Sequence, residues 1–195
     1  MRTILITLFV LLAFSGASQD LSLYQKKEFT YSEGKVLPYR ILYPENYDKN
    51  KKYPLVLFLH GAGERGSDNE KQLVHGSKLF LTPENRKNFP AIVVFPQCPE
   101  NSFWSSVSVD RSKSPVSFEF NYENAITWPL DAVQKLVMQL QADEAIDNKK
   151  CYITGLSMGG MGTFELVYRF PKLFAAAMPI CGGGDAIHYD KRVKK

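Results

Sequence analysis

The chain has 195 residues, of which 45% are hydrophobic and 23% charged, and these proportions are ordinary for one globular domain. They exclude a wholly disordered chain, which would be poorer in hydrophobic residues. The net charge is only +4 and the basic residues are scattered, apart from a solvated stub expected at residues 191–195, so no nucleic-acid partner is indicated.

The start of the chain is a predicted signal peptide, residues 1–18. Arg2 supplies a positive charge, residues 4–14 are apolar except for Thr7, and residues 15–18 are small enough for cleavage after residue 17 or 18. The apolar run is too short to cross a bilayer, which takes about 20 residues. We therefore expect a secreted or periplasmic protein with no stable membrane anchor and one domain at residues 19–195; an uncleaved anchor is the alternative.

The next elements are two predicted strands at residues 23–32 and 36–43, joined through the hairpin signal Glu33-Gly34-Lys35. A continuous apolar run at residues 53–59 then predicts a strand that is buried on both faces.

That buried strand ends in the loop His60-Gly61-Ala62-Gly63-Glu64-Arg65-Gly66. Histidine followed by glycines at this place is typical of the loop that forms half of an oxyanion hole in serine hydrolases. Glycine lets the backbone approach a substrate closely, and the N–H of Ala62 is the predicted donor. We expect His60 to anchor the loop and His75 to be a structural or surface residue. An ordinary loop without chemistry is the alternative.

Secondary structure in the middle of the chain is indicated clearly by some segments and not by others. Residues 69–80 are weakly helical, residues 91–95 predict another buried strand, and residues 129–142 have the apolar spacing of a helix. Residues 100–124 fit neither period. Because a long loop after a parallel strand is often functional, Trp104 is a candidate wall of a substrate pocket; packing of this loop against the domain is the alternative.

The most informative motif is Gly155-Leu156-Ser157-Met158-Gly159, which lies between a predicted strand and a predicted helix. This is the context of a nucleophile elbow, a tight turn that exposes the serine hydroxyl. Side chains at Gly155 and Gly159 would clash with neighbouring backbone. Ser157 is thus the predicted nucleophile and the Met158 N–H the second oxyanion donor. A glycine-rich turn without chemistry is the alternative.

The predicted strands and helices alternate, with strands at residues 150–153 and 174–180 and a helix at residues 161–168 completing the series. Such alternation indicates an α/β domain with a mostly parallel, doubly wrapped sheet.

These motifs, with Phe95-Pro96-Gln97-Cys98-Pro99 and Met178-Pro179-Ile180-Cys181-Gly182-Gly183-Gly184, resemble the α/β-hydrolase superfamily over most of the chain after about residue 35. The resemblance is to its secreted esterases of the dienelactone-hydrolase and feruloyl-esterase type, near the prolyl-oligopeptidase-like enzymes. It implies an α/β-hydrolase fold with an N-terminal antiparallel hairpin. It also implies a secreted serine hydrolase that cleaves small-molecule or carbohydrate-linked carboxylic esters through an acyl-enzyme on Ser157, without a cofactor or metal. A prolyl-oligopeptidase-like peptidase and a non-catalytic binding protein on this fold are the alternatives.

A serine nucleophile also needs a histidine base and a carboxylate that orients it. In this architecture both follow the serine, whereas His60 and His75 precede it. Asp185 and His188 are the alternative acid and base. Relatives carry these groups after further strands, so we expect an incomplete copy that lacks the last strands and helices and is inactive by itself.

Cys98, Cys151 and Cys181 are expected to be three small buried thiols. The expected compartment would permit disulfides. In the strand order of the superfamily, however, two other strands separate those next to Cys98 and Cys181. No residues have metal-ligand spacing.

Overall fold

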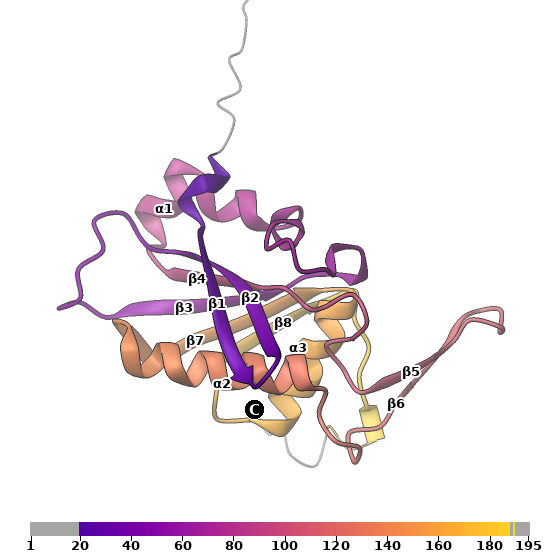
Figure 1. Ribbon diagram of the computed structural model, residues 1–195. Helices are drawn as coiled ribbons and strands as arrows, with labels where there is room; N and C mark the ends of the chain where they lie inside the picture. The colour runs from indigo at the N-terminus through magenta and orange to yellow at the C-terminus, as the bar shows by residue number, and fades with distance from the viewer. Residues whose placement is uncertain (1–19, 188, 190–195) are drawn as a thin grey trace, which may run out of the picture.

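A mixed β-sheet forms the centre of the computed structural model, which describes residues 20–187 and residue 189 (Figure 1). The predicted leader, His188 and residues 191–195 lie outside this part of the chain. The strand order is β1-β2-β4-β3-β7-β8. Strand β2 pairs antiparallel with β1 and β4, and the other pairs are parallel. The strands are β1 (Gln25–Ser32), β2 (Lys35–Leu42), β3 (Tyr53–Leu59), β4 (Ile92–Pro96), β7 (Ile146–Leu156) and β8 (Ala176–Ile180).

Both faces of the sheet are covered, as the sequence predicts. Leu55 and Leu57 of β3 belong to a core shared with α2 (Trp128–Asp143) and α3 (Met158–Arg169). Side chains alternate along a strand, so Phe58 faces the other side, where it joins a second core with Tyr24. This side is covered by α1 (Pro83–Asn88) and by the short 3₁₀ helices η1 (Leu21–Leu23), η3 (Lys71–Leu73) and η4 (Ser77–Leu81). The predicted doubly wrapped sheet with an N-terminal antiparallel pair is confirmed.

The weakly helical stretch at residues 69–80 is not one helix but the two turns η3 and η4. Gly76 separates them in the left-handed region, with φ +81°, and lies on the ring of Phe58. A Cβ at Gly76 would stand 2.6 Å from that ring. Close packing against the sheet therefore overrides the helical spacing.

The segment at residues 100–124 contains a β-hairpin that was not predicted from the sequence. Strands β5 (Val107–Asp110) and β6 (Ser117–Phe120) pair antiparallel and extend away from the main sheet (Figure 1). Val109 pairs with Phe118 and Val107 with Phe120, so one face of the hairpin is apolar. The hairpin is tied to the C-terminal part of the described chain, since Phe120 packs 3.0 Å from the Cβ position of Gly183.

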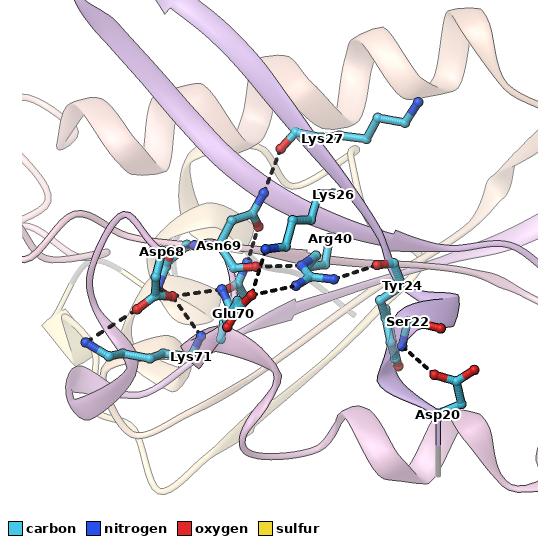
Figure 2. Close-up of polar contacts among 12 residues, drawn as sticks. Asp20, Ser22, Tyr24, Lys26, Lys27, Arg40, Asp68, Asn69, Glu70 and Lys71 are labelled. Atoms are coloured by element: carbon cyan, nitrogen blue, oxygen red, sulfur yellow. Dashed lines mark hydrogen bonds and ion pairs between the residues drawn. The ribbon is translucent and has the colours of Figure 1, made fainter.

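A buried polar network joins the first hairpin to the segment that follows the predicted oxyanion loop (Figure 2). Arg40 donates from Nε to the carbonyl oxygen of Asn69 at 2.5 Å and from Nη1 to that of Tyr24 at 2.7 Å. The Asn69 side-chain amide donates to the carbonyl oxygen of Lys27 at 3.1 Å. Because buried donors left without partners are costly, these contacts fix the position of residues 68–71.

Strand β8 has an open, apolar edge. It pairs with β7 on one side, and no strand in the described chain pairs with its other side. Met178 is 61% exposed, and the alanines of β8 are exposed as well. Cys181, just after β8, is exposed, whereas Cys98 and Cys151 are buried and all three are unbridged. The prediction of three buried thiols is thus wrong for Cys181, because this position follows an edge strand.

Candidate active site

The predicted strand–turn–helix context of Ser157 is present. Ser157 lies between the end of β7 and the start of α3, with φ 55° and ψ −111°. Its N–H donates to the carbonyl oxygen of Ile180 at 2.8 Å, and its own carbonyl oxygen accepts from Met161 at 3.0 Å. A positive φ costs energy in a non-glycine residue and persists only where its surroundings impose it. The residue is exposed, so its hydroxyl can meet a ligand.

The two glycines of the motif are required by backbone contacts. A Cβ at Gly155 would stand 2.3 Å from the carbonyl oxygen of Gly159. A Cβ at Gly159 would stand 1.9 Å from the carbonyl oxygen of Leu59 and 2.8 Å from that of His60. Gly159 thus brings the start of α3 against the end of β3, where the predicted oxyanion loop begins.

The two predicted oxyanion donors lie on these touching segments. Ala62 opens the 3₁₀ turn η2 (Ala62–Glu64), and Met158 opens α3. Neither N–H has a hydrogen-bond partner among residues 20–187 and 189. An N–H with no internal partner at the start of a helix is available to an anionic group. The assignment of both donors stays a prediction.

His60 holds the loop from inside, as the sequence predicts. Its Nδ1 lies 2.6 Å from the carbonyl oxygen of Gly61, and its Nε2 accepts from the N–H of Cys98 at 2.9 Å. Since Nε2 accepts, Nδ1 must carry the proton and donate. Burial lowers the pKa of His60 to about 4, so the ring stays neutral above that pH. Both ring nitrogens are occupied by these two hydrogen bonds. His75 is a surface residue 3.6 Å from the Glu64 carboxylate.

Gln97, directly after β4, supports the same loop, a role that was not predicted from the sequence. Its amide donates to the carbonyl oxygen of Glu64 at 3.2 Å and to Asp68 at 2.9 Å. Its Oε1 accepts from the N–H of Asn69 at 2.7 Å. The signal was available, because a glutamine directly after a buried strand needs polar partners.

Trp104 is fully buried and does not line an open pocket. Its indole Nε1 donates to the carbonyl oxygen of His60 at 3.1 Å, and its Cβ lies 2.7 Å from the Cβ position of Gly162 in α3. This geometry favours the alternative interpretation, in which residues 100–124 pack against the domain.

No described residue supplies a base to Ser157. Its hydroxyl has no hydrogen bond to residues 20–187 or 189, and His60 and His75 are engaged elsewhere. Asp185 is buried, and its carboxylate accepts from the N–H of Tyr122 at 3.3 Å. His188 lies outside the described residues. In the same part of the chain, no group of histidine, cysteine and acidic side chains could hold a metal ion, and no helix has the length and apolar character to span a membrane.

The sequence matches a family model described as "Putative esterase" over residues 34–182. A "Probable feruloyl esterase C" of Aspergillus oryzae is 24% identical over 147 residues, which are 74% of this chain and 46% of that protein. A solved thermostable esterase is 42% identical with a TM-score of 0.76, and the match covers 88% of this chain and 44% of the other. A ferulic acid esterase from Anaeromyces mucronatus, solved with ferulic acid, shares the fold at 21% identity and a TM-score of 0.51, with coverage of 77% and 54%. The chain spans about half the length of these relatives.

Proposed function

Because the chain belongs to the esterase family whose model matches residues 34–182, we propose that it is the nucleophile-bearing part of a secreted serine hydrolase that cleaves carboxylic esters. The observation that carries this proposal is Ser157, an exposed serine with a φ of 55° on a strand–helix turn. Two N–H groups without internal partners lie on the adjoining segments.

In the proposed reaction, Ser157 Oγ adds to the ester carbonyl carbon while a histidine takes the hydroxyl proton. The N–H groups of Ala62 and Met158 donate to the carbonyl oxygen as it becomes an oxyanion, and each such donor contributes about 10²–10³-fold to the rate. The alcohol leaves with the proton, and water then releases the acid from Ser157. In this proposal the histidine and its carboxylate belong to residues that follow in a longer protein. Asp185 and His188 are the alternative pair.

The proposed substrates are small-molecule or carbohydrate-linked esters. This class is supported by the feruloyl esterase relative and by the ferulic acid bound in the fungal structure. A longer protein is supported by the matched relatives, because the match covers only 46% of the feruloyl esterase and 44% of the thermostable esterase.

Ser157 is expected to be the serine that forms a covalent adduct with a fluorophosphonate in the complete gene product. The strained turn presents its hydroxyl to solvent beside the predicted oxyanion donors. The adduct is located by peptide mass spectrometry, and Ser157→Ala should remove it. Ser102→Ala is the control, because Ser102 lies outside the turn. An adduct at another serine refutes the assignment, and no adduct at all favours a binding protein.

We expect the exported protein to lack the leader, since residues 1–18 combine Arg2, an apolar run and small residues. The intact mass of protein recovered outside the cytoplasm should correspond to a start at residue 18 or 19. A mass that still includes Met1 would rule out cleavage.

A further inference from the structure

Glu165 of α3 is a fully buried carboxylate that holds the segment after Trp104. One of its oxygens accepts from Ser105 Oγ at 2.7 Å and from the N–H of Ser106 at 2.6 Å. Its other oxygen accepts from Nε of Arg169 at 2.7 Å. Hydrogen bonds to an ionised group are strong, and a buried charge is tolerated only when it is paired. Glu165 therefore fixes residues 105 and 106 to α3.

Trp104 is fixed against α3 by two contacts and held by a third from Thr127, the residue before α2. Its neighbours are clamped by Glu165, its Cβ rests on Gly162, and its carbonyl oxygen accepts from Thr127 Oγ1 at 2.7 Å. The indole then donates to the carbonyl oxygen of His60, and the two rings meet edge to face at 5.2 Å. Through these contacts, the position of α3 fixes the position of His60, the first residue of the loop.

His60 in turn fixes the orientation of the Ala62 N–H. Its Nδ1–H donates to the carbonyl oxygen of Gly61, and this carbonyl belongs to the same peptide unit as the N–H of Ala62. Because a peptide unit is planar, the direction of the carbonyl fixes the direction of the N–H. The other donor, Met158, is the first residue of α3 itself.

We infer that Trp104 and Glu165 are positioning residues. They fix the position and orientation of the Ala62 N–H relative to the Met158 N–H, because Met158 begins α3 and the loop of Ala62 is held against the same helix. This inference rests on the proposed ester hydrolysis. Neither side chain touches the reacting atoms. Each acts through the contacts Glu165–Ser105, Trp104–His60 and His60–Gly61.

The test compares Trp104→Phe, which removes the indole N–H but keeps a ring, with Glu165→Gln, which removes the charge but keeps the shape. Both are made in the complete gene product and assayed with p-nitrophenyl acetate. Tyr31→Phe is the matched control, because it removes one half-buried hydroxyl that donates to Asp131 of α2 at 2.8 Å and is not one of the contacts named above. Ala62→Pro deletes the donor N–H, and we expect it to lower kcat by about 10²-fold or more. This loss is the reference with which the two positioning variants are compared.

We expect both variants to lower kcat by about tenfold or more with KM within about twofold, because an oxyanion contact strengthens only in the transition state. Tyr31→Phe should keep wild-type values. Hydrogen exchange at the backbone N–H of Cys98, which donates to His60, should be faster in both variants. Wild-type kcat in both variants, together with loss of hydrolysis in Ser157→Ala, would overturn the inference while leaving the proposed function intact.

Failure of the proposed function gives a different result. If the wild-type protein hydrolyses no ester, exchange at the Cys98 N–H decides the inference alone: faster exchange in the variants supports the positioning contacts, and unchanged exchange refutes them. If Trp104→Phe fails to fold because the indole is fully buried, Glu165→Gln provides the same comparison.

Discussion

The 195-residue chain by itself is expected to hydrolyse p-nitrophenyl acetate no faster than buffer does. Within the described residues, the Ser157 hydroxyl has no base, and the two His60 nitrogens are hydrogen-bonded to the backbone of Gly61 and of Cys98. The carboxylate of Asp185 accepts the Tyr122 N–H. Loss of the triad histidine alone lowers turnover about 10⁶-fold in the protease subtilisin, and we expect a loss of similar order here.

The isolated chain should also be poorly soluble. Strand β8 offers an open edge with Met178 exposed, and open apolar edges promote pairing between molecules. On the sheet face that α1 covers, a groove of about 620 Å³ is lined by apolar residues such as Val56, Phe89 and Tyr152. Size-exclusion chromatography should therefore find aggregates rather than a monodisperse monomer.

The comparison is made between the 195-residue chain and the longer protein that we propose, each with and without Ser157→Ala. Activity is expected only in the longer protein with Ser157 intact. If the 195-residue chain is a monomer that turns over the ester in a Ser157-dependent way, the argument for missing groups fails. Asp185→Asn and His188→Gln would then be the next variants.

The sequence predicts those parts of the molecule that depend on local patterns. Residues 53–59 and 91–95 are continuous apolar runs because β3 and β4 are buried on both faces. The elbow is recognisable because Gly155 and Gly159 are each required by a backbone contact. Local pattern and tertiary contact agree at these positions, and the prediction succeeds there.

Prediction fails where a local signal is interrupted or where tertiary contacts determine the structure. Residues 107–110 and 117–120 alternate between apolar and polar, which is a strand signal, but residues 111–116 contain no short hairpin turn motif. Trp104 is a candidate pocket wall in the sequence, and its burial and its contact with Gly162 place it in the core. Glu165 occupies the buried side of α3 with Leu166, yet no local pattern shows that its partners are Ser105 and Ser106.

Gly159→Ala is expected to destabilise the complete gene product severely and to abolish labelling of Ser157. The added Cβ would stand 1.9 Å from the carbonyl oxygen of Leu59, so either α3 or the end of β3 must move. Backbone cannot yield as a flexible side chain does, and overpacking of this kind costs about 3 kcal/mol or more. In a domain of about 150–250 residues that is a fall of roughly 6–12 °C in Tm, and the fall is smaller in a longer domain.

The matched control is Gly63→Ala, in the predicted oxyanion loop, where a Cβ would meet nothing within 4 Å. This variant should keep its Tm within about 2–4 °C and should still label, because the change in stability is about 1 kcal/mol at most. Thermal unfolding by circular dichroism and fluorophosphonate labelling measure both effects. Because Gly159 sets the separation of Ser157 and Met158 from the loop at His60, the two effects should occur together. Gly159→Ala protein that melts and labels like the wild type would mean that the elbow does not pack against β3 in this way, and the proposed placement of the two oxyanion donors would fail with it.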